Sequence, residues 1–347
     1  MTHSRFLQRA YELARPHHPH PNPRVGAVVV DEGGEVIGEG AHEGPGRPHA
    51  EAVALERAGK SHGATVYVSL EPCNHQGRTP PCVERLIAER VGRVVVGTLD
   101  PDERVAGTGV EALRRAGIDV IVLDDPDATE VDPAYFHARK TGLALVTLKY
   151  AMTLDGAVAA MDRTSQWITS EQARADAHSL RAANDAVIVG TGTLVADDPR
   201  LDVRLPGYEG PQPRPVIVAG GTDLPRDRAI WEREPIVVSP NEIPIPAGDL
   251  LVVGGDDRPG PEAVCKALAE TGYLAVLLEG GPTLAGAWMR SGVVARGVVY
   301  IGGRVGGGTG RSPLGGRFGS IGDAVGVVIT DIRRLGADLR IDFELGG

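Results

Sequence analysis

The hydrophobic pattern of residues 1–123 alternates between helical and strand-like periods. Apolar residues recur at helical spacing from Phe6 to Ala14, and Pro16 ends that segment. A turn sequence at 31–34 separates two strand-like runs, which is typical of a hairpin. The helices and strands that follow alternate, which favours a layered α/β sandwich around a sheet of about five strands. The expected strands are 25–30, 35–39, 64–70, 93–97 and 119–123, and the later helices are 49–58, 82–89 and 109–116.

A second α/β series starts at residue 143, after an acidic stretch at 124–132 that breaks the pattern. A chain of 347 residues exceeds the usual size of one domain, so we expect two. The predicted organisation is a first domain at 1–123, a linker at 124–142 and a second domain at 143–347. In the second domain we expect strands at 143–150, 185–189, 215–218, 236–238, 250–253 and 274–278, helices at 170–182, 261–270 and 282–289, and antiparallel strands at 327–329 and 339–343.

Composition and charge restrict the class of protein. The formal net charge of −10 and the scattered Lys and Arg residues argue against a nucleic-acid or anionic-membrane surface. The N-terminus leads into an amphipathic segment, and no apolar run approaches the ~20 residues of a membrane span. Three cysteines cannot make a disulfide framework. We therefore expect a cytoplasmic protein without nucleic-acid or membrane partners.

Four residues in two short segments predict a metal site. His49 and Glu51 form an H-x-E pair, and Cys73 and Cys82 flank an insert of eight residues, with Pro72 directly before the first cysteine. One imidazole and two thiolates suit a tetrahedral Zn²⁺ whose fourth position is open to water. Glu51 would relay protons without binding the metal. This combination is typical of a zinc nucleobase deaminase.

A structural zinc site is the alternative for the same residues. Such a site normally has four protein ligands. His42 or His75 would have to supply the fourth, so the two hypotheses differ in what lies next to the three ligands.

Three further segments surround these residues. They are Pro21-Asn22-Pro23-Arg24-Val25-Gly26-Ala27, Gly38-Glu39-Gly40-Ala41-His42 and the insert Asn74-His75-Gln76-Gly77-Arg78-Thr79-Pro80-Pro81. With them, the first domain resembles the pyrimidine deaminase of riboflavin biosynthesis, which is the N-terminal half of a bifunctional deaminase–reductase family. The long insert is the discriminating feature, because the general deaminase signature has P-C-x-x-C. Asp102 and Glu103 depart from the family pattern, in which Asn-Pro is usual.

This resemblance implies a cytidine-deaminase-like α/β/α sandwich and a set of substrate contacts. Asn22 and His42 would contact the pyrimidine, while His75 and Arg78 would reach toward the ribose phosphate. Other interpretations stay open for two of them. Asn22 between prolines suits a turn whatever the function, and Arg78 is equally compatible with a solvated surface cation.

A strand, a Gly-rich turn and a helix start follow one another at 278–287. Such a turn presents backbone N–H groups and a helix dipole to a phosphate, although it is not the G-x-G-x-x-G of a Rossmann fold. Taken alone, it is equally compatible with an ordinary tight turn. Together with Leu154-Asp155-Gly156 and Ser165-Gln166-Trp167-Ile168-Thr169, this run resembles the reductase half of the same family, which has a dihydrofolate-reductase-like α/β fold and uses NADPH.

The resemblance implies two groups of residues in the second domain. Arg181 and Arg204 suit a 5′-phosphate, because a guanidinium binds phosphate well. The alternatives are that Trp167 is a core residue and Arg181 an exposed helix residue. The expected substrate contacts are Lys149, Ser165, Arg181, Leu201, Arg204 and Glu279, and the expected NADPH contacts are Ala151, Trp167, Thr193, Asp197, Gly220, Gly281, Pro282, Thr283, Leu284, Ala285, Gly286 and Ala287.

Two departures from the family pattern concern the second domain. Ala219-Gly220-Gly221-Thr222 occupies a turn near the cofactor where Asp followed by Ser or Thr is usual, and Gly303 stands where proline is usual. The first departure puts the grip on NADPH, or its preference over NADH, in doubt. Cys265, within an expected helix, is interpreted as a small buried residue.

The sequence thus predicts a bifunctional enzyme of riboflavin biosynthesis. The first domain, with one Zn²⁺, would hydrolyse the 2-amino group of a diamino-(phosphoribosylamino)pyrimidinone, and the second would reduce the ribosyl group to ribityl with NADPH. The family also implies a homo-oligomer. The alternatives are a nucleic-acid-editing deaminase with an inert second domain, a non-enzymatic zinc scaffold, and a deaminase whose second domain has lost reductase activity.

Overall fold

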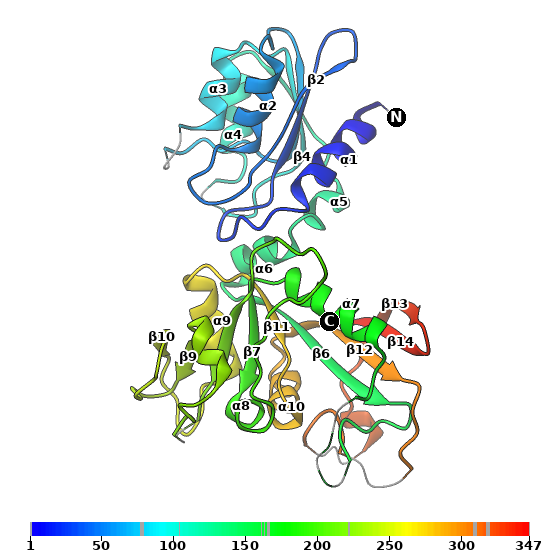
Figure 1. Ribbon diagram of the computed structural model, residues 1–347. Coiled ribbons are helices and arrows are strands. Elements are labelled where there is room, and N and C mark those ends of the chain that lie inside the picture. Colours follow the sequence, from blue (N-terminus) through cyan, green and yellow to red (C-terminus); the bar gives the residue numbers. More distant parts are fainter. Residues whose placement is uncertain are drawn as a thin grey trace. The chain divides into compact units, whose positions relative to one another are not determined.

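The chain folds into two compact units, Met1–Gly142 and Leu143–Gly347 (Figure 1). The computed structural model describes residues 2–76, 80–103, 105–160, 162, 164, 167–220, 223–307, 311–316 and 320–346. Within these ranges, no helix combines the length and the apolar character needed to cross a bilayer.

The first unit is a five-stranded sheet between two layers of helices (Figure 1). The strand order is β2 (Val36–Ala41), β1 (Gly26–Val30), β3 (Thr65–Leu70), β4 (Arg93–Thr98), β5 (Asp119–Val122). β1 is antiparallel to both its neighbours, whereas β3, β4 and β5 are parallel. One face carries α1 (Thr2–Ala14) and α5 (Pro126–Thr129), and the other carries α2 (Ala50–Ala58), α3 (Cys82–Ala88) and α4 (Thr108–Arg115).

The apolar stripe of α1 explains its place on the sheet. Its buried residues pack with alternate side chains of the strands, among them Val28, Tyr67 and Val95. Glycine allows this close approach, since a Cβ at Gly26 would collide with the backbone carbonyl of Ala10 in α1. The apolar faces that the sequence predicts for the helix and for the strands therefore pack together in one core.

The segment 124–142, expected to be a linker, is folded and belongs to the first unit. It forms α5 and α6 (Pro133–Thr141), and Ala128 and Val131 join the core beneath α1. Asp125 and Asp132 accept backbone N–H groups in the first turns of these two helices. Acidic side chains that suggested a linker are thus helix N-caps, which favour the same residue types.

The second unit contains a nine-stranded sheet. Its order is β10 (Asp249–Val252), β9 (Ile236–Ser239), β8 (Arg214–Val218), β7 (Ala186–Gly190), β11 (Ala275–Leu278), β6 (Leu145–Thr153), β12 (Val294–Gly302), β14 (Asp338–Leu345), β13 (Val327–Leu335). The strands from β10 to β12 are parallel, and β14 is antiparallel to both its neighbours. The helices are α7 (Glu171–Ala182), α8 (Thr191–Asp197), α9 (Pro261–Glu270) and α10 (Pro282–Ser291), with short 3₁₀ turns η1 (Ala229–Arg233) and η2 (Ile321–Asp323).

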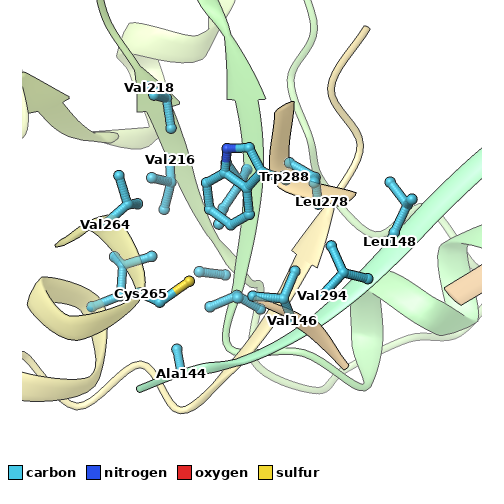
Figure 2. Packing of buried hydrophobic residues seen from close by; sticks show 14 of the residues in the cluster. Ala144, Val146, Leu148, Val216, Val218, Val264, Cys265, Leu278, Trp288 and Val294 are labelled. Carbon is cyan, nitrogen blue, oxygen red and sulfur yellow. The ribbon is translucent and has the colours of Figure 1, made fainter. Parts of the chain in front are cut away.

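Helices cover both faces of this sheet. On one face, Cys265 of α9 and Trp288 of α10 pack against strand residues such as Val146, Val216 and Leu278 (Figure 2). On the other, α8 and η1 cover the opposite side chains of the same strands. Cys265 is fully buried, as its helical context predicted.

Two elements of the second unit were not predicted from sequence. β12 lies between β6 and β14 and joins the parallel strands to the antiparallel pair, but Arg296 and Gly297 interrupt its apolar run. Arg296 is accommodated by donating to the Thr147 hydroxyl at 3.0 Å. The short α8 begins directly at the end of β7, so no turn sequence marks the boundary between the strand and the helix.

We predict that Gly26→Ala destabilises the first unit by about 1–3 kcal/mol, because the new methyl group must displace the α1 backbone. Hydrogen exchange of the β1 and α1 amides in the full chain measures this loss of protection. Gly44→Ala is the matched control, since a Cβ there meets no atom within 4 Å. Equal protection in the two variants would contradict the packing argument.

Candidate functional site

Three potential zinc ligands converge in the first unit. His49 is the N-cap residue of α2, Cys73 follows β3, and Cys82 is the first residue of α3. The Nδ1 atom of His49 lies 3.2 Å from the Sγ of Cys82 and 3.4 Å from the Sγ of Cys73. All three ligand atoms lie within 4.8 Å of one another.

The geometry of these atoms fits a zinc ion. Tetrahedral zinc with Zn–S of about 2.3 Å and Zn–N of about 2.0 Å places N and S ligands about 3.5 Å apart. The observed separations are close to this value. The backbone N–H of Cys82 also donates to the Sγ of Cys73 at 3.3 Å, which favours a thiolate there. The hydrogen bond between the two cysteines lowers the pKa of Cys73 and raises that of Cys82.

No fourth protein ligand joins the trio in the part of the chain that the structure describes. The cluster of metal-binding atoms holds His49, Cys73 and Cys82 and does not include His42 or His75. This arrangement disfavours the structural-zinc alternative, because a structural site closes all four positions.

Glu51 lies in the first turn of α2, on the wall of the same pocket as two of these ligands. Its side chain is buried, with only 3% of the residue exposed. Burial raises the pKa of Glu51 to about 7. A carboxyl group with this pKa exchanges a proton readily near neutral pH.

Asn22 and His42 form one polar unit beside the zinc ligands. Nδ1 of His42 lies 3.0 Å from the carbonyl oxygen of Pro48, which can only accept, so Nδ1 carries the proton. Nε2 of His42 then accepts from the amide of Asn22 at 3.0 Å. Burial lowers the pKa of His42 and supports this neutral form. The arrangement fixes the orientation of the Asn22 amide at the pocket wall.

A pocket of about 500 Å³ connects these groups. The sequence-predicted residues Asn22, His42, His49, Glu51, Cys73 and His75 all line it, while Arg78 falls outside the described residues. Five further polar or charged lining residues were not singled out as site residues from the sequence, namely Arg47, Glu71, Asp100, Tyr135 and Arg139. For Asp100, its place after the parallel strand β4 was an available signal, because such strand ends carry sites.

Glu71 organises the backbone around the pocket. Its buried carboxylate accepts the N–H groups of Gly107, Gly109, Val110 and Asp100 at 2.8 to 3.3 Å. Three of these donors belong to the N-terminal turn of α4 or to its cap. The side chain therefore ties the end of β3, two residues before Cys73, to the loop after β4.

In the second unit, Lys149, Arg181 and Glu279 come together from β6, α7 and the end of β11. Nε and Nη2 of Arg181 donate to the two carboxylate oxygens of Glu279 at 2.7 and 2.9 Å, and the Lys149 ammonium lies 3.6 Å away. Burial acts to raise the pKa of Glu279, but Lys149 and Arg181 outweigh it and lower the pKa to about 2. Arg181 is therefore a partly buried ion-pair residue and not an exposed helix residue.

Arg204 lies next to this group and is much more open. Its side chain is 60% exposed, and its guanidinium lies 3.6 Å from the carboxylate of Asp202, whose backbone carbonyl accepts from Arg181. His178, which no motif in the sequence singled out, also contacts that carbonyl at 3.1 Å. Burial and the charges of Arg181 and Arg204 lower the pKa of His178. Leu201 is buried beside them with a positive φ of 55°.

The residues expected to bind NADPH divide into two groups. The Gly281 N–H donates to the Thr193 hydroxyl at 3.3 Å, which joins the start of α10 to α8, the helix that ends at Asp197. Gly281 caps α10 without a side-chain hydrogen bond, so the N-terminal turn suits an anion. Close packing explains why residue 286 is glycine, because a Cβ at Gly286 would collide with the carbonyl of Gly315.

The other expected contacts are not joined to α8 and α10 by a described hydrogen bond. Trp167 is 57% exposed, with the Arg174 guanidinium 4.4 Å from its ring centre, so it is not the core residue that was considered. Ala151 lies on β6, and Gly220 lies against the side chain of Arg258. Ser165 falls outside the described residues.

Comparison with known proteins identifies the family. The model of the RibD C-terminal domain matches residues 144–339, and that of the cytidine and deoxycytidylate deaminase zinc-binding region matches residues 1–98. Riboflavin biosynthesis protein RibD of Mycobacterium tuberculosis is 44% identical over 286 residues, which cover 81% of this chain and 79% of that protein. The chain belongs to the RibD family.

Solved structures of the RibD family share this fold over the whole chain. Acinetobacter baumannii RibD superposes with a TM-score of 0.92 at 33% identity, covering 99% of both chains. A Thermotoga maritima protein, described as a diaminohydroxyphosphoribosylaminopyrimidine deaminase/5-amino-6-(5-phosphoribosylamino)uracil reductase, superposes with a TM-score of 0.88 at 31% identity, again over 99% of both chains. The predicted combination of a deaminase fold and a reductase fold is thereby confirmed.

Membership of the RibD family also decides between broad functional classes. The chain is a bifunctional riboflavin-biosynthesis enzyme, with a zinc-binding deaminase domain followed by a reductase domain. The non-enzymatic scaffold is therefore set aside.

We predict that Cys73→Ala and Cys82→Ala each remove most of the bound zinc, because each leaves only two ligands. Metal analysis of the purified full chain measures the stoichiometry, which we expect to be near one in the native protein. Cys265→Ala is the matched control, since that thiol is buried in the second unit. Loss of zinc from the control, or its retention in both test variants, would contradict the ligand set.

We predict that Glu279→Gln destabilises the second unit by about 3 kcal/mol at pH 7, because it leaves Lys149 and Arg181 without their counter-charge. The folded pKa of Glu279 is lowered, so its contribution is complete above the unfolded value of about 4.5 and is lost as pH falls through about 2. The difference between variant and native protein should therefore shrink below about pH 4.5.

Tryptophan fluorescence during urea unfolding measures this effect, since Trp167, Trp231 and Trp288 all lie in the second unit. Glu270→Gln, at an exposed end of α9, is the control and should change stability by less than about 0.5 kcal/mol. A penalty independent of pH down to 3 would show that ionisation of Glu279 is not its source.

Proposed function

We propose that this RibD-family chain acts on a diaminohydroxyphosphoribosylaminopyrimidine in two steps. The first unit would replace the 2-amino group by oxygen and release ammonia, and the second would reduce the ribosyl group to ribityl. The observation that carries the proposal is the convergence of the His49, Cys73 and Cys82 ligand atoms, two of whose residues, His49 and Cys73, line one pocket with Glu51. The Thermotoga maritima relative, whose name specifies a deaminase and a reductase for these compounds, supports the substrate.

His49, Cys73 and Cys82 would hold one Zn²⁺. When bound, this ion lowers the pKa of a water molecule toward neutrality. Glu51 would take a proton from that water and deliver it to the departing amino group, so that water and the amine become the carbonyl and ammonia. The fixed amide of Asn22, held by His42, would orient the pyrimidine ring, while His75 and Arg78 would face its sugar phosphate.

A small phosphorylated molecule suits the pocket better than nucleic acid. The pocket volume of about 500 Å³ lies within the usual range for small-molecule sites. The net charge of −10 opposes a nucleic-acid surface. We therefore place no nucleic acid among the partners, and the thiolate ligands favour a reducing, cytoplasmic compartment.

In the second unit, the cluster of Lys149, Arg181 and Glu279 would bind the ribosyl group. It carries two cations for one carboxylate, and the exposed Arg204 adds a third positive charge suited to phosphate. Ser165 and Leu201 complete the proposed substrate contacts.

NADPH, when bound, supplies the hydride that reduces C1′ of the ribosyl group. The uncapped start of α10 and the neighbouring Thr193 would hold its phosphates, with Ala151, Trp167, Asp197 and Gly220 as further contacts.

We further propose that the chain forms a homo-oligomer. β13 lies at the edge of the nine-stranded sheet, and Val328, Ile329 and Ile332 on it are each more than half exposed. An exposed apolar edge strand of this kind favours pairing with another chain.

The proposal is tested by supplying the pyrimidine phosphate with and without NADPH. We predict ammonia release in both cases and NADPH oxidation only after deamination. Glu51→Gln should retain zinc and lose at least about a thousandfold in ammonia release, because the proton relay is removed. Given the already deaminated compound, the same variant should oxidise NADPH at the native rate, which controls for folding. Ammonia release by Glu51→Gln at the native rate would refute the role assigned to Glu51.

A further inference from the structure

The acidic and basic side chains that line the deaminase pocket differ in burial. Its three carboxylates in the described part of the chain, Glu51, Glu71 and Asp100, are all buried. Among the described residues that line it, the guanidinium groups are those of Arg47 and Arg139, and both residues are exposed. The polar interior of the pocket is therefore acidic or neutral, and its solvent-facing rim is cationic, in a chain whose net charge is −10.

The buried carboxylates Glu71 and Asp100 are hydrogen-bonded within the protein, and Asp100 also attracts the Arg139 guanidinium electrostatically. Glu71 is occupied by four backbone N–H groups. Asp100 accepts from the Tyr135 hydroxyl at 3.2 Å and from the Asp102 N–H at 2.9 Å. Burial raises the pKa of Asp100, and the positive charge of Arg139 acts in the opposite direction.

Arg139 is held at the rim by α6. The buried Tyr135, one turn earlier in the helix, is anchored through its hydroxyl to Asp100, and the Arg139 guanidinium lies 4.9 Å from the centre of the Tyr135 ring. A guanidinium over an aromatic ring keeps its N–H groups directed sideways, where they can bind a phosphate in two-point fashion.

The helix that carries Arg139 is itself fixed to the pocket. Asp132 caps α6 and, with 2% of its side chain exposed, binds Nε2 of His20 at 2.9 Å. It also accepts the Arg24 N–H at 2.9 Å. The turn that bears Asn22 and the helix that bears Arg139 therefore share one buried anchor, so the base-binding and rim residues keep a fixed spacing.

We propose that Arg47 and Arg139 form a phosphate-binding rim, which selects phosphorylated over unphosphorylated ribosylaminopyrimidines in the deaminase step. The inference rests on the proposed deaminase function and adds specificity residues to it. It also gives the segment 124–142 a role in catalysis, because α6 carries the phosphate ligand Arg139.

The test compares Arg139→Gln and Arg47→Gln with Lys140→Gln in the full chain. Lys140 is an exposed cation on the same helix that does not line the pocket. Ammonia release is measured with the phosphorylated pyrimidine and with its dephosphorylated form. We expect the ratio of the two kcat/KM values to fall about 10- to 100-fold in each test variant, the usual effect of losing a charge-assisted hydrogen bond, and to stay at the native value in Lys140→Gln.

A merely structural role for Arg139 would lower both kcat/KM values together, and an unchanged ratio would overturn the proposal. Calorimetric titration with ribose 5-phosphate, in which every chain also carries Arg204→Gln so that the proposed phosphate contact of the second unit is removed, separates this outcome from failure of the deaminase assignment itself. If the native chain releases no ammonia, the deaminase proposal fails, and the titration alone decides the rim. Weaker binding by Arg139→Gln than by the native chain and Lys140→Gln supports the rim, and equal binding by all three refutes it.

Discussion

Glu71 places a carboxylate in the interior of the first unit, directly after β3 and two residues before Cys73. A buried charge of this kind is tolerated only when hydrogen bonds replace its water, and four backbone N–H groups do so here. Those donors lie in the loop after β4 and in the first turn of α4. The approach is so close that a Cβ at Gly109 would collide with the carbonyl of Pro72. One ionic constraint therefore fixes the two loops that meet at the zinc ligands.

The second unit uses a buried carboxylate for a different purpose. Glu279 is surrounded by side-chain cations instead of backbone donors, and the excess of positive charge is left over for a ligand. The low pKa of Glu279 comes from Lys149 and Arg181, which outweigh its burial, whereas the pKa of His178 is lowered first by burial and then by Arg181 and Arg204. Arg181 already donates two hydrogen bonds to the carboxylate of Glu279. The exposed Arg204 is therefore better suited to bind an external phosphate.

Local patterns in the sequence predicted most of this architecture, and their failures have physical causes. The zinc trio was recognisable because ligand type and order are local, and because helix starts place His49 and Cys82 predictably. The helices within 124–142 were missed because aspartates such as Asp125 and Asp132 are common both in linkers and at helix N-caps. Arg139 was missed with it, since a pocket wall made by a distant helix leaves no local motif. β12 was missed because Arg296 interrupts an apolar run that only its neighbours in the sheet complete.

The net charge of the chain gives these local arrangements their importance. An anionic substrate approaching a protein of charge −10 is repelled on average, but screening limits that repulsion to about 8 Å at physiological ionic strength. Within that distance, individual side chains dominate. In the second unit, the buried carboxylate of Glu279 is balanced by Lys149 and Arg181, which together carry one positive charge more than it does. The local field at that site is therefore positive although the molecule as a whole is acidic, because paired cations outnumber the buried carboxylate within the distance over which the substrate meets individual charges.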